Sequence, residues 1–304
     1  MELIHPQISA FAAVVEEGTF EAAAQRLSLT ASALSQRIKL LESRLGQTLL
    51  IRRPPCRPAM SGQKLLQRIR LIRILESEAL AELNVASKSN PSNPLTISVT
   101  SESLQTWVMT ALARLYREHG FQFNVRIEDG NRELSLLREG VAMGAITTVS
   151  DPINGCDALP LGMMRYVAVA SPEFAAHYFP RGIDSIVLSR APMLVFGGRH
   201  ELSLQFVRKI TRAKIRPPIQ NLPSPASYID AITAGLGWCM APARLLEAEI
   251  ERRKVVVIDD CRRLEVSVYW QHWSLESSSL KLIGDTFFDC SRAWLDDPAN
   301  DPKT

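Results

Sequence analysis

Five polar residues between positions 30 and 40 recur at spacings that suit contacts with DNA. Ser32, Ser35, Gln36 and Lys39 follow the three- and four-residue intervals of one helix face, with Arg37 beside them. Glutamine can pair with adenine through two hydrogen bonds, serine can contact bases or phosphates, and the two cations suit phosphate or guanine. The residues therefore indicate a helix that enters the major groove. A solvated face of an ordinary helical hairpin has the same periodicity, so that alternative stays open here.

A basic, proline-rich loop follows this stretch. Arg52, Arg53 and Arg57 are interleaved with a proline pair and a further proline within residues 52–58. Proline stiffens a loop because its ring fixes one backbone angle. Arginines on such a loop suit the DNA backbone or the minor groove. The segment therefore predicts the wing of a winged helix-turn-helix, and the alternative is a solvated turn.

Hydroxyls and carboxylates also follow three predicted strands further along the chain. Thr100–Ser103 come after the first strand, Glu128 and Asp129 after the second, and Thr147–Thr148 after the third. Open α/β sheets bind ligands at the carboxyl ends of strands, beside helix N-termini. Hydroxyls and free amides suit a carboxylate, and the acidic residues, with Glu102, suit a cation, so the set indicates a basic amino acid. Each acidic residue could instead only compensate a helix dipole.

Short amphipathic helices must position the first cluster. Thr19 and Thr30 stand where N-caps are expected, and apolar residues follow each of them at helical spacing. A preceding helix is predicted to open at Pro6 and end at Gly18, and a short strand at Gln47–Ile51. The apolar faces comprise Ile8, Phe11, Ala12 and Val15, then Phe20, Ala23, Ala24 and Leu27, then Leu34, Ile38, Leu41 and Leu45.

A long helix is predicted behind the wing. Residues 61–86 contain no proline and are rich in leucine, isoleucine, arginine, glutamine and glutamate. Its apolar residues form a stripe along one side, interrupted at Glu76. The helix is too long merely to close a small domain, so this stripe should pack against a partner. Residues 87–94, SKSNPSNP, read as a hinge. The stripe comprises Leu65, Ile69, Ile72, Ala79 and Leu83.

From residue 95 strands and helices alternate, which predicts a parallel, doubly wound α/β region. The expected strands are Leu95–Val99, Phe123–Ile127, Gly144–Thr148, Tyr166–Ala170, Met193–Phe196, Gly237–Met240, Val255–Ile258 and Val266–Trp270. The expected helices are Ser103–Glu118, Arg132–Glu139, Leu204–Ile210, Ala226–Ala234, Arg244–Glu251 and Ser278–Leu295. Three tryptophans beside these strands could line a cleft, but core positions are favoured: Trp238, Trp270 and Trp273.

The composition is that of an ordinary globular protein of 304 residues, 46% hydrophobic and 22% charged. Up to residue 90 there are 12 Lys and Arg against 8 Asp and Glu, whereas the remainder is nearly neutral, which fits a DNA-binding module attached to a body with another task. No signal sequence or membrane span is visible, so we expect a cytoplasmic protein without membrane contact. Five scattered cysteines form no zinc pattern, and we expect reduced thiols, no metal and no cofactor.

The run Phe20-x-x-Ala23-Ala24-x-x-Leu27 followed by Ser32-Ala33-Leu34-Ser35-Gln36-x-Ile38-x-x-Leu41-Glu42-x-x-Leu45-Gly46 resembles the amino-terminal signature of LysR-type transcriptional regulators. The resemblance implies a recognition helix beginning near Thr30 and an antiparallel pairing of residues 61–86 with a second subunit. It also implies a homodimer or homotetramer that acts on promoter DNA with RNA polymerase. Some family members sense redox state through a cysteine pair. The expected DNA-binding residues are Thr30, Ser32, Ser35, Gln36, Arg37, Lys39, Arg52, Arg53 and Arg57.

The resemblance further implies an effector region like a periplasmic binding protein, with two lobes joined by crossover strands. The expected divisions are an all-α winged helix-turn-helix domain (1–60), a dimerisation helix (61–86), a hinge (87–94), lobe one (95–165 and 267–298) and lobe two (166–266). The phrases SESLQTWV, RIEDGNRELSLLREGVAMGAIT, GLGWCMAP and YWQHWSLESSSL are similar to the ArgP and LysG subgroup, the regulators of basic amino-acid export. Lysine or arginine is then the implied effector, although Glu102 stands where that subgroup usually has Asp. The expected effector residues are Glu102, Ser103, Trp107, Glu128, Asp129, Thr147, Ser227 and Tyr228.

Two other functions compete with that of an effector-responsive regulator. One is an architectural protein or replication-initiation inhibitor that binds DNA regardless of metabolites. The other is an enzyme or a solute receptor built on the α/β region. No nucleophile with its base, metal cluster or phosphate loop appears at recognisable spacing, so we expect no catalytic residue.

Overall fold

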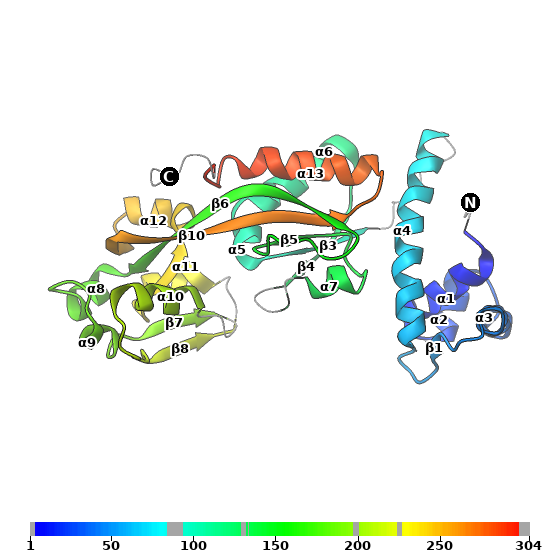
Figure 1. Ribbon diagram of the computed structural model, residues 1–304, viewed down its shortest axis with the longest axis horizontal. Coiled ribbons are helices and arrows are strands. Elements are labelled where there is room, and N and C mark those ends of the chain that lie inside the picture. Colours follow the sequence, from blue (N-terminus) through cyan, green and yellow to red (C-terminus); the bar gives the residue numbers. More distant parts are fainter. Residues whose placement is uncertain are drawn as a thin grey trace.

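The computed structural model describes residues 4–83, 94–128, 132, 134–196, 201–223 and 227–297. Its amino-terminal part is a three-helix domain with a small hairpin (Figure 1). Phe11, Leu34, Ile38 and Leu49 are fully or almost fully buried in one core, as the apolar spacing predicts. The elements are α1 (Pro6–Glu17), α2 (Phe20–Arg26), α3 (Ala31–Leu45), β1 (Leu50–Ile51) and β2 (Arg57–Pro58), so the predicted strand at 47–51 shortens to two residues.

The predicted N-caps are confirmed. The Thr19 side chain accepts a hydrogen bond from the Ala22 amide, and the Thr30 side chain accepts one from the Ala33 amide. Each cap satisfies an amide at a helix start that has no partner within the helix. The turn between the two caps is therefore fixed locally, and α3 leaves it in a defined direction.

Helix α4 (Met60–Glu82) stands between the amino-terminal domain and the α/β region (Figure 1). Its start is locked to the hairpin: the Ala59 amide donates to the Leu49 carbonyl oxygen at 2.8 Å, and a Cβ on Gly62 would lie only 2.0 Å from that same oxygen. Within the described residues, no helix is both long enough and apolar enough to cross a membrane. The predicted hinge at 87–94 lies outside the described residues except for Pro94.

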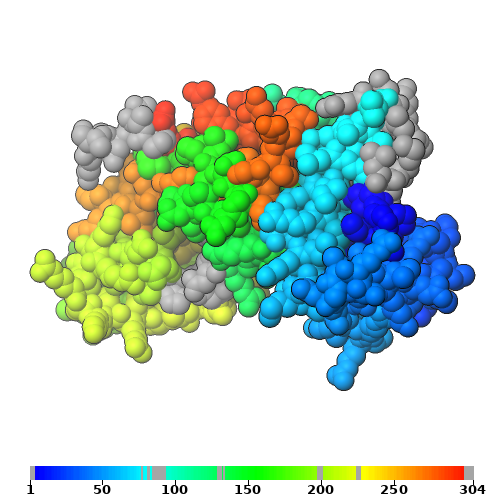
Figure 2. Space-filling model, turned by 45° about the vertical axis from the view of Figure 1, so that its right-hand side comes forward, coloured from blue at the N-terminus to red at the C-terminus, as the bar shows by residue number. Residues whose placement is uncertain are grey.

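The far half of α4 docks on the α/β region, and Figure 2 shows the cyan helix lying against green and orange surfaces. Leu71 and Ile74 join a buried cluster with Leu137, Trp273 and other residues of that region. The predicted stripe therefore divides, because Ile69 is buried with the amino-terminal core whereas the apolar residues of its other part are exposed. The exposed members are Ile72, Ala79 and Leu83, and Leu75 is exposed beside them.

The main sheet has the strand order β4-β3-β5-β10-β6-β9. Strand β3 is parallel to β4 and β5, but β10 is antiparallel to both β5 and β6, so the prediction of a parallel sheet holds only for part of it. A separate parallel pair, β7 and β8, lies in the second lobe (Figure 1). The strands are β3 (Leu95–Val99), β4 (Phe123–Ile127), β5 (Gly144–Thr147), β6 (Cys156–Ala170), β7 (Met193–Phe196), β8 (Ile219–Leu222), β9 (Cys239–Pro242) and β10 (Val256–Trp273).

Strand β8 was not predicted, β9 begins two residues after the predicted Gly237, and two long strands differ most from the sequence prediction. Strand β6 begins ten residues before the predicted Tyr166, and the two strands predicted at 255–258 and 266–270 form one long strand, β10. These are the crossover strands of the two lobes, and they pair along almost their whole length with irregular register. Pro160 in β6 and exposed charged residues in β10 weaken the local strand pattern in the sequence. Pairing with a long partner strand nevertheless makes both segments extended.

The helices surround this sheet, with α6 and α13 on one side and α7 on the other (Figure 1). Trp238, Trp270 and Trp273 are buried, which confirms the core interpretation. The predicted last helix ends at Ser291, four residues early. The helices are α5 (Ser101–Ser103), the π-helical turn η1 (Leu104–Val108), α6 (Met109–His119), α7 (Ser135–Arg138), α8 (Pro172–Tyr178), α9 (Ser185–Leu188), α10 (Glu201–Ile210), α11 (Tyr228–Thr233), η4 (Ala243–Leu246), α12 (Glu247–Glu251) and α13 (Ser278–Ser291).

Candidate DNA-binding surface and effector site

Helix α3 presents its polar residues away from the core. Ser32, Gln36 and Lys39 are exposed, and Ser35 and Arg37 are half-buried. Their spacing places Ser32, Ser35, Gln36 and Lys39 on one face, opposite the buried leucine and isoleucine positions. The helix is thus anchored by one side and offers hydroxyl, amide and ammonium groups on the other.

The predicted wing is the β1–β2 hairpin and its connecting loop. Arg53 and Arg57 are exposed on it. Arg52 is engaged within the protein, because its Nη1 donates to the Ser35 Oγ at 3.2 Å and its Nη2 pairs with a Glu42 carboxylate oxygen at 2.9 Å. All three predicted arginines are therefore exposed on the wing, and Arg52 in addition joins the wing to α3.

Glu42 is a further residue that connects α3 to the wing, and its position in the sequence does not predict this role. Its Oε1 accepts hydrogen bonds from the Leu49 amide at 2.8 Å and the Leu50 amide at 3.2 Å, while its Oε2 binds Arg52. One carboxylate thus joins the end of α3 to the first strand of the wing. The signal was present as the Leu41-Glu42 pair of the family signature, but spacing alone does not show which backbone amides a side chain will meet.

In lobe one, the parallel strands bring the predicted hydroxyls to one edge of the sheet. Thr100 follows β3, and Thr147 ends β5, the neighbour of β3. The Thr100 hydroxyl accepts from the Ser103 amide at 3.3 Å and donates to the Ser103 hydroxyl at 2.9 Å. Both threonines and Ser103 are buried, while Glu102 is half-buried beside them. Thr100, Glu102 and Ser103 stand at the start of the continuous helical segment 101–119.

Glu128 follows β4 at the same edge, and its carboxylate caps a helix. It accepts from the Ser135 hydroxyl and from the Leu136 amide, the latter at 3.2 Å, in the first turn of α7. This arrangement matches the alternative in which the carboxylate serves a helix start. Asp129 lies outside the described residues.

Of the remaining predicted effector residues, Trp107 and Tyr228 have packing roles in this structure. Trp107 is fully buried in η1, and its ring meets Phe287 of α13 edge-on at 5.7 Å between centroids. Tyr228 stacks on Phe196 at 3.9 Å, and its hydroxyl donates to the Met240 carbonyl oxygen at 3.2 Å. Ser227 occupies the N-cap position of α11 without a capping hydrogen bond from its side chain.

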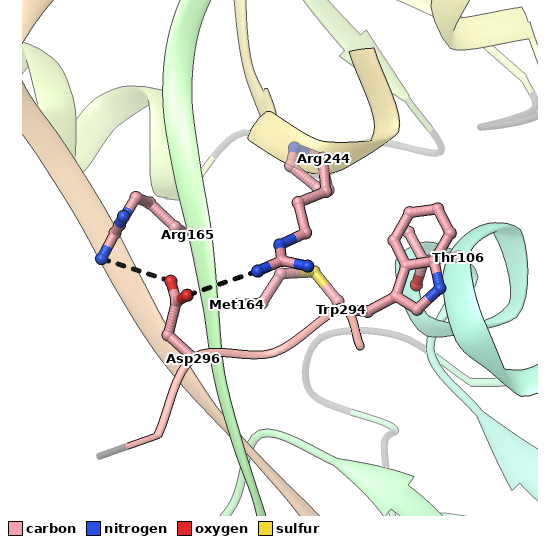
Figure 3. A pocket seen from close by; sticks show the side chains of 7 residues that line it. Thr106, Met164, Arg165, Arg244, Trp294 and Asp296 are labelled. Carbon is pink, nitrogen blue, oxygen red and sulfur yellow. Dashed lines mark ion pairs between the residues drawn. The ribbon is translucent and has the colours of Figure 1, made fainter. Parts of the chain in front are cut away.

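A small cavity lies where η4 of lobe two meets the end of lobe one (Figure 3). Asp296 pairs there with Arg165 at 3.2 Å and with Arg244 at 3.8 Å. The cavity has a volume of about 20 Å³, which suits a water molecule and is too small for an amino acid. A larger groove of about 280 Å³ lies along α13 and includes Asp157, His272 and Lys281. Neither space is lined by a predicted effector residue.

The burial of each cysteine predicts how reactive its thiol is. All five are free, and burial raises the pKa of Cys156, with a contribution from Asp157, to about 12, and raises that of Cys239 even more strongly. A thiol with a raised pKa stays protonated and unreactive below that pKa. At pH 8 we expect iodoacetamide to modify the exposed Cys261 of the native protein, and Cys156 and Cys239 only after unfolding. Mass spectrometry of peptides checks this, and rapid native labelling of Cys239 would contradict it.

Taken together, a helix-turn-helix with a basic wing and a two-lobed α/β region define a DNA-binding regulatory protein. Two family models match the chain: the bacterial regulatory helix-turn-helix protein, lysR family, over residues 6–63, and the LysR substrate binding domain over residues 88–287. The chain therefore belongs to the LysR family of transcriptional regulators, and it is a regulator and not an enzyme.

Several of the similar proteins are LysG and ArgP regulators. The transcriptional regulator LysG of Mycobacterium tuberculosis is 41% identical over 285 residues, covering 94% of this chain and 92% of the relative. ArgP of Photobacterium profundum is 35% identical, covering 95% and 97%. Among solved structures, ArgP from Mycobacterium tuberculosis has a TM-score of 0.85 at 39% identity, covering 97% of this chain and 100% of that one. LysG from Corynebacterium glutamicum with bound effector Arg has a TM-score of 0.76 at 31% identity, covering 96% and 100%.

Proposed function

We propose that this protein is a transcriptional regulator that senses arginine or lysine and controls genes such as that of an amino-acid exporter. The observation that carries the proposal is the similarity, over 96% of this chain, to a LysG structure that holds arginine as its effector. The same regulator would act in the cytoplasm on promoter DNA together with RNA polymerase.

The effector site would lie at the strand ends of lobe one. The hydroxyls of Ser103 and Thr147 would face the carboxylate of the amino acid, and Glu102 with Asp129 would face its cationic groups. Glu128 would support the site indirectly, because its carboxylate already accepts a hydrogen bond from the first turn of α7. Trp107 would support Ser103 from the core, and Ser227 and Tyr228 would close the site from lobe two.

Helix α4 would pass the state of this site to the DNA-binding domain. Arg70 donates to the Gly140 carbonyl oxygen at 2.9 Å, and Glu78 accepts from the Ser277 hydroxyl at 2.7 Å and the Ser279 amide at 2.9 Å. Burial alone would raise the pKa of Glu78, but the hydrogen bonds from Ser279 and Ser277 outweigh it and lower that pKa. The contact therefore stabilises docking at neutral pH and weakens as the pH falls through the lowered pKa.

Oligomerisation would use another side of the same helix. Ile72, Leu75, Ala79 and Leu83 are exposed at helical intervals of three and four, which is typical of a seam that packs against another helix. An antiparallel pair of α4 helices would place two α3 helices on one duplex, and two such pairs would form a tetramer.

Thermal unfolding with each amino acid in turn tests the effector. Arginine or lysine at a hundredfold excess over its dissociation constant should stabilise the folded protein by about 2.7 kcal/mol and raise the melting temperature by several degrees. Glu102→Gln and Asp129→Asn, made singly, should reduce the shift. Glu251→Gln, which changes an exposed glutamate of α12, is the matched control and should leave it unchanged.

The contrary outcome has a clear meaning. If neither amino acid changes the melting temperature while duplex DNA does, the proposed effector is wrong. A protein that binds DNA regardless of metabolites, in an architectural or replication-control role, would then explain the fold better.

A further inference from the structure

Arg52 joins three elements of the DNA-binding domain. Besides Ser35 and Glu42, both on α3, its guanidinium lies over the Phe20 ring of α2 at 5.6 Å from the centroid. The side chain is 35% exposed, and that of Glu42 is 15% exposed, so the pair is partly shielded from solvent. A guanidinium with a fork of donors on a carboxylate and a hydroxyl, and with an aromatic ring beneath it, has little freedom to turn away.

The contact with Arg52 determines how the Ser35 hydroxyl takes part in hydrogen bonds. Arginine has five N–H donors and no acceptor, so the Ser35 oxygen must accept in the bond that joins them. The hydroxyl hydrogen is then left to donate elsewhere. On the face that α3 presents to DNA, this favours an acceptor, such as a phosphate oxygen, O6 or N7 of guanine, or O4 of thymine.

We propose that Arg52 is a positioning residue for sequence recognition: it acts through Ser35, whose hydroxyl it orients as a donor, and does not itself bind the DNA backbone. The inference rests on the proposed recognition role of Ser35. It separates Arg52 from Arg53 and Arg57: all three arginines are exposed on the wing, but among the described contacts it is the side chain of Arg52 that binds α3.

The two roles predict different salt dependence. A cation that binds a phosphate releases counterions, so its removal lowers the slope of log affinity against log salt by about 0.9. Removal of a positioning residue leaves that slope unchanged and lowers only the preference for the correct sequence. Arg53→Ala, one residue along the wing, is therefore the matched comparison for Arg52→Ala.

The experiment uses full-length protein and a duplex enriched by the wild type from a random library, with a scrambled duplex of equal length. Ser35→Ala should lower the ratio of specific to scrambled affinity by about tenfold, and Arg52→Ala should lower it similarly. The double variant should lose no more than either single variant, because both remove one interaction. Both single variants should also lose preference at the same base pair.

A second variant guards against loss of folding. Arg52→Lys keeps the charge but cannot reach Ser35 and Glu42 together with a planar fork, so it should lose specificity while keeping the wild-type salt slope. Losses that add in the double variant, or a reduced slope in Arg52→Ala, would overturn the proposal in favour of direct phosphate binding. A lower melting temperature with an unchanged specificity ratio would overturn it in favour of a purely structural role. If Ser35→Ala alone changes nothing, the recognition role of Ser35 fails first, and that result is separate.

Discussion

Replacing Ser35 and Gln36 together by alanine is expected to remove most of the sequence preference of the protein while sparing its general affinity for DNA. A glutamine paired with adenine through two hydrogen bonds and a serine hydrogen bond together contribute about 2–4 kcal/mol. That free energy corresponds to about 30- to 1,000-fold in specific affinity. Lys39, Arg53 and Arg57 remain in the variant, so its binding to a scrambled duplex should persist and should weaken with salt as in the wild type.

Competition binding with the library-selected duplex measures this effect. The matched control is Ser150→Ala with Gln205→Ala, because both residues are exposed and have the same side-chain types but lie in the α/β region, outside the DNA-binding domain. The control should bind as the wild type does, and both double variants should keep the wild-type melting temperature. Unchanged specific affinity in the Ser35 and Gln36 variant would show that α3 is not the recognition helix.

Gly62→Ala is expected to have the largest effect on stability. The new methyl group would lie 2.0 Å from the Leu49 carbonyl oxygen and 3.1 Å from the Phe11 ring. That carbonyl cannot retreat cheaply, because it accepts from the Ala59 amide, and the Leu49 amide in turn donates to Glu42. We expect a loss of about 3 kcal/mol or more from the amino-terminal domain, which lowers its melting temperature by about 10 °C or more.

Differential scanning calorimetry separates this loss from any effect on the α/β region. Gly284→Ala is the matched control, since Gly284 is also buried within a long helix, but its added methyl group would meet the nearest atom, on Trp270, at an ordinary 3.4 Å. Alanine favours a helix over glycine by up to about 1 kcal/mol, so the control should be neutral or slightly stabilising. Normal stability and normal DNA binding in Gly62→Ala would show that α4 and the hairpin are not locked together.

The amino-terminal half was predictable because its signals are local. Thr19 and Thr30 cap helices within three residues of themselves, and the apolar spacing of α3 follows from one helix alone. The crossover strands were not fully predictable, because β6 and β10 owe their length to pairing with each other across about a hundred residues of chain. Pro160 and the charges of β10 oppose a strand locally, and the partner strand decides the outcome.

The candidate sites show the same division. Ser32, Gln36 and Lys39 lie on one exposed face, as their spacing predicts. Two hydrogen bonds could not be predicted from the sequence: the one that Glu128 accepts from α7 and the one that Arg52 donates to Ser35. Residue type identifies a carboxylate or a guanidinium, but its partner depends on which segments the fold brings next to it.

The contact between Gly62 and Leu49 also has a mechanical consequence. Because it leaves no room for sliding, α4 and the hairpin move as one body, and the 23 residues of α4 form a lever of about 34 Å. A tilt of about 10° about the docked end of such a lever would carry its other end through about 6 Å, nearly two base-pair steps. A tilt of about 6° on lobe one would therefore be enough to move a recognition helix by about one base-pair step.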